Sequence, residues 1–203
     1  MKFQNIFLLV LVSFSLAGCY TPLSYKADLL PRTPSGLHHV IKKGAVQLVV
    51  DEPLLGAERK QVSNSWKGGA QGIAFPAGQY IREIATAVLH DAVLNNSPSR
   101  DIQYTFRIKN VQYFYEYKDV KLSVTTRFSN LYSWANMDIE VTTQDGKVIM
   151  AETIHGEERN EVDKQQLEKM GPDAGLNMAL IDALHNVVCK GIEALAKIEQ
   201  TKN

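Results

Sequence analysis

The sequence predicts an α+β fold, a two-layer sandwich in which two helices pack on one face of a mainly antiparallel sheet. Apolar residues recur at helical spacing in two stretches, 79–94 and 173–200. Between them the pattern changes to alternation over most of 102–155, which is typical of half-buried strands. The dipeptide Asp145-Gly146 separates two alternating runs and indicates a β-hairpin.

The first expected strand is 45–51, "AVQLVVD", which is short and rich in β-branched residues. The polar stretch after it ends in "WKGGAQGIAFPAG", whose glycines resemble a phosphate-binding loop only superficially. The Lys-Ser/Thr ending of that loop is missing, and so is its tight strand–loop–helix spacing. We therefore interpret this stretch as a flexible connection.

The two expected helices are amphipathic. In 79–94, Arg82 and His90 lie opposite the apolar side chains, and the Pro98 region ends the helix. Its apolar stripe consists of Ile81, Ile84, Ala85, Val88, Leu89 and Ala92. The stripe of 173–200 consists of Leu180, Leu184, Val187, Val188, Leu195 and Ile198, and Gly191 allows a close approach to its neighbours. Both helices are therefore expected to cover a core.

The strand expected over 102–117 changes its phase. The alternating apolar residues are Ile102, Tyr104, Phe106 and Ile108 before Asn110, and Val111, Tyr113, Tyr115 and Tyr117 after it. A slip of one residue moves every following side chain to the other face of a sheet. Either a β-bulge lies near Lys109–Asn110, or both faces of this strand are covered.

Two hairpins follow from the remaining alternation. The run 120–128 also alternates, so we expect a first hairpin with a tight turn near Lys118–Asp119. A second hairpin is expected over 135–156, where Asp145-Gly146 supplies the positive φ angles of a two-residue turn. The acidic stretch 157–168 is expected to be loop or frayed helix.

Residues 1–18 have the features of a secretory signal peptide. Lys2 provides a positive charge, and the apolar run after it is too short to span a bilayer as a helix. The segment ends in Leu16-Ala17-Gly18-Cys19, which resembles the lipobox of bacterial lipoprotein precursors. The resemblance implies that Cys19 is acylated and becomes the first residue of the mature chain. Residue 20 is Tyr and not Asp, which by resemblance to Gram-negative lipoproteins implies an outer-membrane protein that faces the periplasm.

We expect residues 19–44 to form a lipidated tether and residues 45–203 to form a single α+β domain. Prolines, among them Pro31 and Pro34, interrupt the first segment and favour extended chain. His38-His39 lies in it, but adjacent side chains rarely converge and no third ligand is near. No metal site is therefore predicted.

The sequence does not predict an enzyme, a cofactor site or a nucleic-acid-binding surface. The chain carries 22 basic and 22 acidic side chains, so it lacks the basic excess that nucleic acid requires. Asp182, His185 and Cys189 share one edge of the last helix, and they make a thiol-dependent periplasmic enzyme a remote alternative. A catalytic cysteine is usually activated at a helix N-terminus, whereas Cys189 lies past the middle of its helix. With Cys19 acylated, Cys189 would have no disulfide partner within the chain.

The candidate binding residues are aromatic. They are Tyr113, Tyr115, Tyr117, Tyr132 and Trp134, which fall in the alternating strands. Two helices cover only one face of such a sheet, so the opposite face meets water, a partner or lipid. Tyrosine and tryptophan suit surfaces that are wet at one end and apolar at the other. We therefore expect these rings to bind a partner, with packing inside the sheet or under the loops as the alternative.

The layout of the mature chain is similar to that of small envelope lipoproteins of Gram-negative bacteria. It resembles the YajG-like family, auxiliary lipoproteins of ABC-type lipid transporters and the accessory lipoprotein of lipopolysaccharide assembly. The shared features are the lipobox, a helix after a first strand, the hairpin "ANMDIEVTTQDGKVIMAE" and the closing helix "ALIDALHNVVCKGIEALAK". The resemblance transfers no binding residues.

That resemblance implies a non-catalytic, membrane-anchored accessory component of an envelope assembly or transport complex, with an envelope protein as its partner. The alternative is a periplasmic carrier of lipid or glycolipid. A concave apolar cleft would favour the carrier, and a flat aromatic face would favour the protein-binding accessory.

Overall fold

The computed structural model describes residues 20–42, 45–55, 59–62, 72–93, 101–121, 127–157, 159–162 and 172–201. The side chains of 20–21, 55, 59–62, 72–73, 116–121, 127–130, 159–162 and 172–173 lie outside this description. The first half contains β1 (Tyr20–Pro22), the 3-10 helices η1 (Ala27–Leu29) and η2 (Ser35–Leu37), β2 (Ala45–Val50), α2 (Glu52–Leu55), β3 (Arg59–Val62), β4 (Gly72–Phe75) and α3 (Ala77–Ala92). The second half contains β5 (Ile102–Lys121), β6 (Arg127–Thr143), β7 (Val148–His155), β8 (Arg159–Val162) and α5 (Pro172–Thr201).

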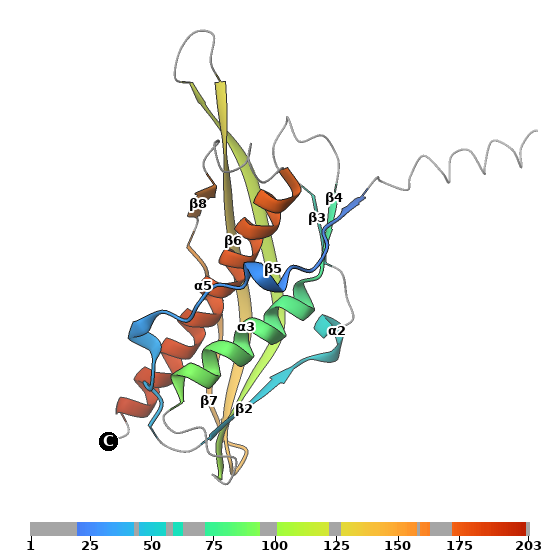
Figure 1. Ribbon diagram of the computed structural model, residues 1–203. Coiled ribbons are helices and arrows are strands. Elements are labelled where there is room, and N and C mark those ends of the chain that lie inside the picture. The colour runs from blue at the N-terminus through green and yellow to red at the C-terminus, as the bar shows by residue number, and fades with distance from the viewer. Residues whose placement is uncertain are drawn as a thin grey trace, which may run out of the picture.

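The main sheet has the strand order β2-β5-β6-β7, and β8 pairs with β6 beyond the end of β7. β2 runs parallel to β5, and the crossover between them contains α3. The other neighbours in this sheet are antiparallel. β5 and β6 alone continue past Tyr117 and Leu131 among the described strands, and they form a two-stranded arm that projects from the body (Figure 1).

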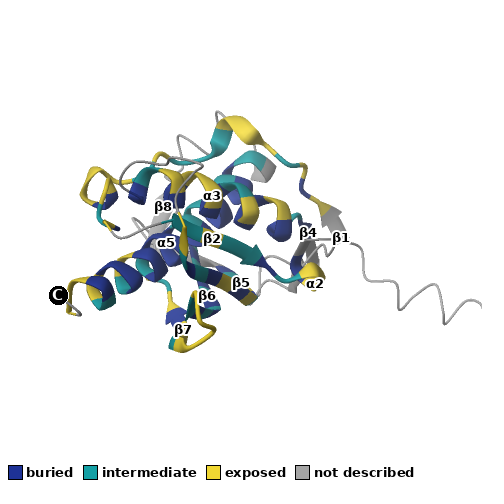
Figure 2. Cartoon of the chain, turned by 90° about the horizontal axis from the view of Figure 1, so that it is seen from below, coloured by how far each residue is buried: buried dark blue, intermediate teal, exposed yellow. Residues whose placement is uncertain are grey.

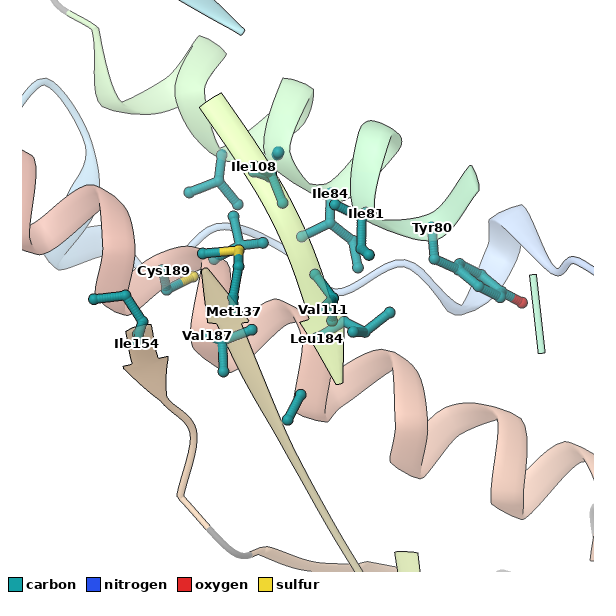
Figure 3. Close-up of a cluster of buried hydrophobic side chains, with 14 of the residues drawn as sticks. Tyr80, Ile81, Ile84, Ile108, Val111, Met137, Ile154, Leu184, Val187 and Cys189 are labelled. Atoms are coloured by element: carbon teal, nitrogen blue, oxygen red, sulfur yellow. The ribbon is translucent and has the colours of Figure 1, made fainter. Parts of the chain in front are cut away.

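Both long helices, α3 and α5, cover the same face of this sheet (Figures 1 and 2). The predicted α+β sandwich is confirmed. All the predicted stripe residues of α3 are buried, as are those of α5 except the half-buried Ile198. Side chains from α3, β5, β6 and α5 meet in one core between the layers (Figure 3). A Cβ on Gly191 would lie 3.1 Å from Met137 Cε and 3.2 Å from Phe106 Cζ, so this glycine does bring α5 close to the sheet.

The phase change in β5 is a β-bulge. The register with β6 shifts between Ile108 and Asn110, so that Ile108 pairs with Ile139 and Asn110 pairs with Asp138. The bulge inserts one residue and thereby cancels the slip in the sequence pattern. As a result, the apolar residues on both sides of it point to the helix-covered face.

The expected turn near Lys118–Asp119 is wrong, because β5 passes through both residues and pairs with β6 as far as Lys121–Arg127. The connection between these strands lies at 122–126, outside the described residues. Continuous cross-strand pairing outweighs the polar Lys-Asp pair, which is only a weak turn signal. The acidic stretch expected as loop or helix contains β8, and its residues 163–168 lie outside the described residues.

The hairpin at Asp145-Gly146 is confirmed between β6 and β7, but its turn is longer than expected. Gly146 has φ 80° and is the turn residue with positive φ; Asp145 is not. The Gly146 N–H donates to Thr143 O at 2.9 Å, and the Thr143 N–H donates to Lys147 O at 2.9 Å. These bonds enclose a three-residue loop, a turn followed by one left-handed glycine.

The expected tether over 19–44 is wrong for its described part, 20–42. β1 pairs with β4 in a second sheet of order β1-β4-β3, so part of the stretch expected as a flexible connection is also a strand. Leu23, Leu37 and Ile41 are buried in the core. Apolar residues between the prolines thus pack on the domain, because burying them outweighs the freedom of an extended chain. Cys19 and the predicted signal peptide lie outside the described residues.

Within the described part of the chain, no helix combines the length and the apolar character needed to cross a membrane.

Candidate functional site

The face of the main sheet opposite α3 and α5 is covered by no described helix or strand. One half of it is polar. Arg107 Nε donates to Asp51 Oδ1 at 2.7 Å, and this bond and the carboxylate charge raise the pKa of the guanidinium. Lys109 donates to Glu140 across β5 and β6.

The ladder of polar contacts on this half continues onto β7. Asp138 accepts from Asn110 Nδ2 at 3.2 Å and from the Thr153 hydroxyl at 2.6 Å. His155 Nδ1 lies 3.2 Å from Asn136 Oδ1. These side chains satisfy one another across three strands, which is the behaviour of a solvated sheet face.

The other half of the open face is aromatic. Phe114 of β5 lies directly opposite Trp134 of β6, with ring centroids 5.3 Å apart and ring planes 13° from parallel. Tyr132 follows on the same face of β6, two residues along. All three side chains are half-buried although no described element covers them. We call Phe114, Tyr132 and Trp134 the aromatic patch.

The prediction that Tyr113 and Tyr115 lie on the open face is wrong. Their exposed fractions are 2% and 3%, and both belong to the core under the helices. Tyr113 packs edge-on against Phe75, with ring centroids 5.2 Å apart. The bulge at Ile108/Asn110 is the cause, because it turns the odd-numbered residues after it towards the helices. The backbone of Tyr117 pairs with Leu131, and its side chain lies outside the described residues.

Tyr132 and Trp134 were among the residues predicted from the sequence, whereas Phe114 was not. The same bulge explains both results. If Val111 and Phe106 share the buried face, then Phe114 must share the open face with its cross-strand neighbour Trp134. The phase change in β5 would have indicated Phe114 only if a bulge had been chosen over a strand covered on both faces, and that choice required the pairing with β6.

The thiol of Cys189 is 6% exposed and lies among apolar side chains of the core (Figure 3). Its Sγ lies 3.5 Å from His185 Nε2 on the same helix, and both His185 and Asp182 are half-buried.

No set of three metal-ligating side chains occurs among the described residues. The rings of His38 and His39 are 6.4 Å apart and meet edge to face.

Two hollows on the described surface bear on the carrier hypothesis. A groove of about 220 Å³ between β2 and α3 is lined by Val46, Leu48, Thr86, Leu89, His90 and Val93. This volume is below the range of about 300–1,000 Å³ that is common for small-molecule sites. A larger hollow of about 450 Å³ is lined by Gln103, Tyr104, Thr143, Gln144 and Asp145, which are mostly polar. Neither is the large apolar cleft that a lipid carrier requires, and neither is lined by Asp182, His185 or Cys189.

No protein-family model matches the chain, and no curated protein matches its sequence. Among solved structures, it is similar to a minor lipoprotein from Acinetobacter baumannii, with a TM-score of 0.33, 12% identity, and 74% of this chain and 93% of that one covered. For a candidate lipoprotein from Caulobacter crescentus the TM-score is 0.35 at 12% identity, with 78% and 92% covered. For an uncharacterized protein the TM-score is 0.34 at 12% identity, with 88% of this chain and 97% of that one covered. At TM-scores this low, the likeness establishes neither a common fold nor a common function.

Proposed function

We propose that the mature protein is a non-catalytic lipoprotein of the outer membrane that binds an envelope protein through the aromatic patch. The anchor is Cys19, the last residue of the sequence Leu-Ala-Gly-Cys. Several long acyl chains on one residue make attachment practically permanent, because each buried methylene contributes about 0.8 kcal/mol. The protein faces the periplasm, where it serves as an accessory component of an assembly or transport complex.

The position of β1 decides how such an anchor would hold the domain. β1 begins at Tyr20, and Tyr20 pairs with Gly72 in the small sheet. Because no free chain separates Cys19 from this strand, the domain would lie against the bilayer and not at the end of a tether. Its partner is therefore expected within the membrane or close to its surface.

The observation that carries the binding proposal is the stacked pair Phe114 and Trp134, on a sheet face that no described helix or strand covers. Aromatic side chains are enriched at the centres of protein interfaces, and Trp and Tyr dominate interfacial hot spots. A flat aromatic face of this kind favours a protein surface over a single lipid molecule, which needs a concave site.

The anchor is tested with Cys19→Ala in the full precursor. We expect the loss of labelling by radioactive palmitate and the accumulation of the uncleaved chain. Normal labelling and cleavage of the variant would contradict the lipobox interpretation. This test is independent of the patch.

The patch is tested in living cells with a photo-reactive phenylalanine analogue in place of Trp134. The matched control carries the analogue at Asn136, the next residue on the same face of β6. We expect one envelope protein to be cross-linked from position 134 and not from 136, and Phe114→Ala to abolish this adduct. No adduct at 134, or the same adduct from both positions, would contradict the proposal. A lipid adduct without a protein would favour the carrier.

A further inference from the structure

β2 is an edge strand of the main sheet, and β5 is its only partner among the described strands. The Asp51 N–H donates to Ile108 O at 3.0 Å. In a parallel pair, alternate residues direct their backbone groups to the partner strand, so this bond shows which residues of β2 face β5. The odd-numbered residues of β2 therefore bond to β5. The backbone N–H and C=O groups of Val46, Leu48 and Val50 point away from the sheet, where they can pair with another strand.

Edge strands of soluble proteins usually carry charges or prolines that prevent such pairing. β2 has the sequence Ala-Val-Gln-Leu-Val-Val, which contains neither. The apolar groove between β2 and α3 lies next to this edge, and it is lined in part by Val46, Leu48 and Leu89. The edge thus presents backbone groups that no described strand pairs with, together with half-buried apolar side chains.

The charges that flank β2 identify the strand that fits this edge. Lys42 lies five positions before Gln47, and Glu52 lies five positions after it; both side chains are exposed. A basic residue thus precedes the uncharged strand, and an acidic residue, the first of α2, follows it. A second copy of β2 that runs antiparallel to the first brings an acidic end beside each basic end. It is therefore the electrostatic complement of this edge.

We propose that two copies of the protein pair through antiparallel β2 strands, with Gln47 of each copy at the twofold axis. In this register Val46 faces Leu48 of the second copy, and both present the backbone groups that β5 leaves unused. The end of β2 that Lys42 precedes then lies beside the end of the second copy's β2 that Glu52 follows. Such isologous pairing is typical of twofold dimers, and it joins two main sheets into one.

The same register closes the groove. Side chains of even-numbered β2 residues point to the helix-covered face, as shown by the pairing of Val46 with Tyr104 and of Leu48 with Phe106. In the dimer, Val46 and Leu48 of the second copy lie on that face beside the groove and remove its apolar lining from water. The helical layers of both copies then lie on the same side of the joined sheet.

The axis is tested with Gln47→Cys in the purified full-length protein, oxidised with copper phenanthroline. At a non-hydrogen-bonded antiparallel pair the Cα atoms are about 4.5 Å apart, which suits a disulfide. We expect a disulfide-linked dimer. The matched control is Thr105→Cys, which pairs with Gln47 on the same face but lies one strand further from the axis, and is expected to remain monomeric. The unsubstituted chain, oxidised in parallel, shows any cross-linking through Cys19 or Cys189. The result therefore does not depend on whether Cys19 carries the lipid anchor.

The charges provide a second test that does not depend on a cysteine. Lys42→Glu places two acidic groups together at each end of the paired strands, and we expect self-association to weaken roughly ten-fold by sedimentation. Lys42→Glu combined with Glu52→Lys exchanges the charges and should restore it. A Gln47→Cys chain that stays monomeric, or a charge exchange that fails to restore dimers of Lys42→Glu, would overturn the proposal. A Gln47→Cys adduct with a different protein in cells would assign the edge to a foreign strand instead.

Discussion

The Tyr80 hydroxyl on α3 donates to Asn177 Oδ1 on α5 at 3.0 Å and accepts the Lys26 N–H at 2.8 Å. Asn177 Nδ2 in turn donates to Ser24 O at 2.7 Å. Tyr80 and Asn177 are buried, so water cannot replace these partners. The two residues join both helices to the segment that precedes β2, and they explain why this segment is held on the domain.

Tyr80→Phe should destabilise the protein by about 1–3 kcal/mol, because it leaves a buried amide oxygen and a backbone N–H without their shared partner. The free energy of unfolding is measured by urea denaturation. Tyr25→Phe is the control: its ring packs on Tyr80, but its hydroxyl bonds the half-buried Glu83, and we expect a loss below about 1 kcal/mol. Equal losses in the two variants would contradict the buried network.

The packing of 20–42 is tested with Ile41→Ala. Ile41 is fully buried, so truncation should cost about 2–5 kcal/mol. The control is Val40→Ala, whose side chain is only half-buried and should cost clearly less. If both variants had the stability of the parent chain, residues 20–42 would be a tether after all.

Gly156→Ala tests the contact between the end of β7 and β6. The Gly156 N–H donates to Ala135 O at 2.7 Å, and an added Cβ would lie 2.5 Å from the same oxygen. Because the obstacle is backbone, we expect a loss of about 1–3 kcal/mol. Gly36→Ala is the matched control, since its Cβ would meet nothing within 4 Å. Thermal unfolding should therefore distinguish the two variants, and an unchanged Gly156→Ala would show that the strand end adjusts without cost.

The stability should fall as the pH rises above 10. Burial raises the pKa of Tyr80 and of Tyr104 above the ordinary value of 10.0. In that range the unfolded chain loses these protons while the native chain keeps them, so each group lowers stability by up to roughly 1.4 kcal/mol per pH unit. Urea midpoints are measured from about pH 8 to about pH 11.5, and Tyr104→Phe should show the shallower decline. A variant with the parent slope would exclude Tyr104 as a contributor.

Local patterns were sufficient for the elements that bury one continuous apolar face. The stripe of α3, the stripe of α5 and the hairpin at Gly146 follow directly from residue spacing, because a wrong register would expose the core. The alternative at Asn110 could not be decided from the sequence. A bulge and a strand covered on both faces give the same alternating pattern, and only the pairing with β6 distinguishes them.

The remaining differences depend on tertiary contacts. Prolines in 20–42 favour an extended chain, and this segment is indeed largely irregular. Leu23 and Ile41 are nevertheless buried, and their N–H groups donate to Ala74 O on β4 and Ala92 O on α3, which are distant in sequence. β1 and β4 are short strands whose pairing joins Tyr20 to Gly72, and no local pattern encodes such a contact. The bulge places Tyr113 and Tyr115 in the core and leaves Trp134 on the opposite face of the sheet, where binding of a partner stays a prediction.

The aromatic patch has its own signature in a double-mutant cycle of Phe114→Ala and Trp134→Ala. Because the rings stack directly across β5 and β6, we expect a coupling energy of about 0.5–1.5 kcal/mol between the two losses of stability. The matched cycle uses Gln112→Ala and Asn136→Ala, the neighbouring pair on the same face, and should show a coupling close to zero. Since all three patch residues are half-buried, on a face without a covering element among the described residues, the single variants should remain folded. A patch that binds a partner would then lose its cross-link in variants that keep their fold, whereas loss of both together would mean that these rings serve the stability of the sheet.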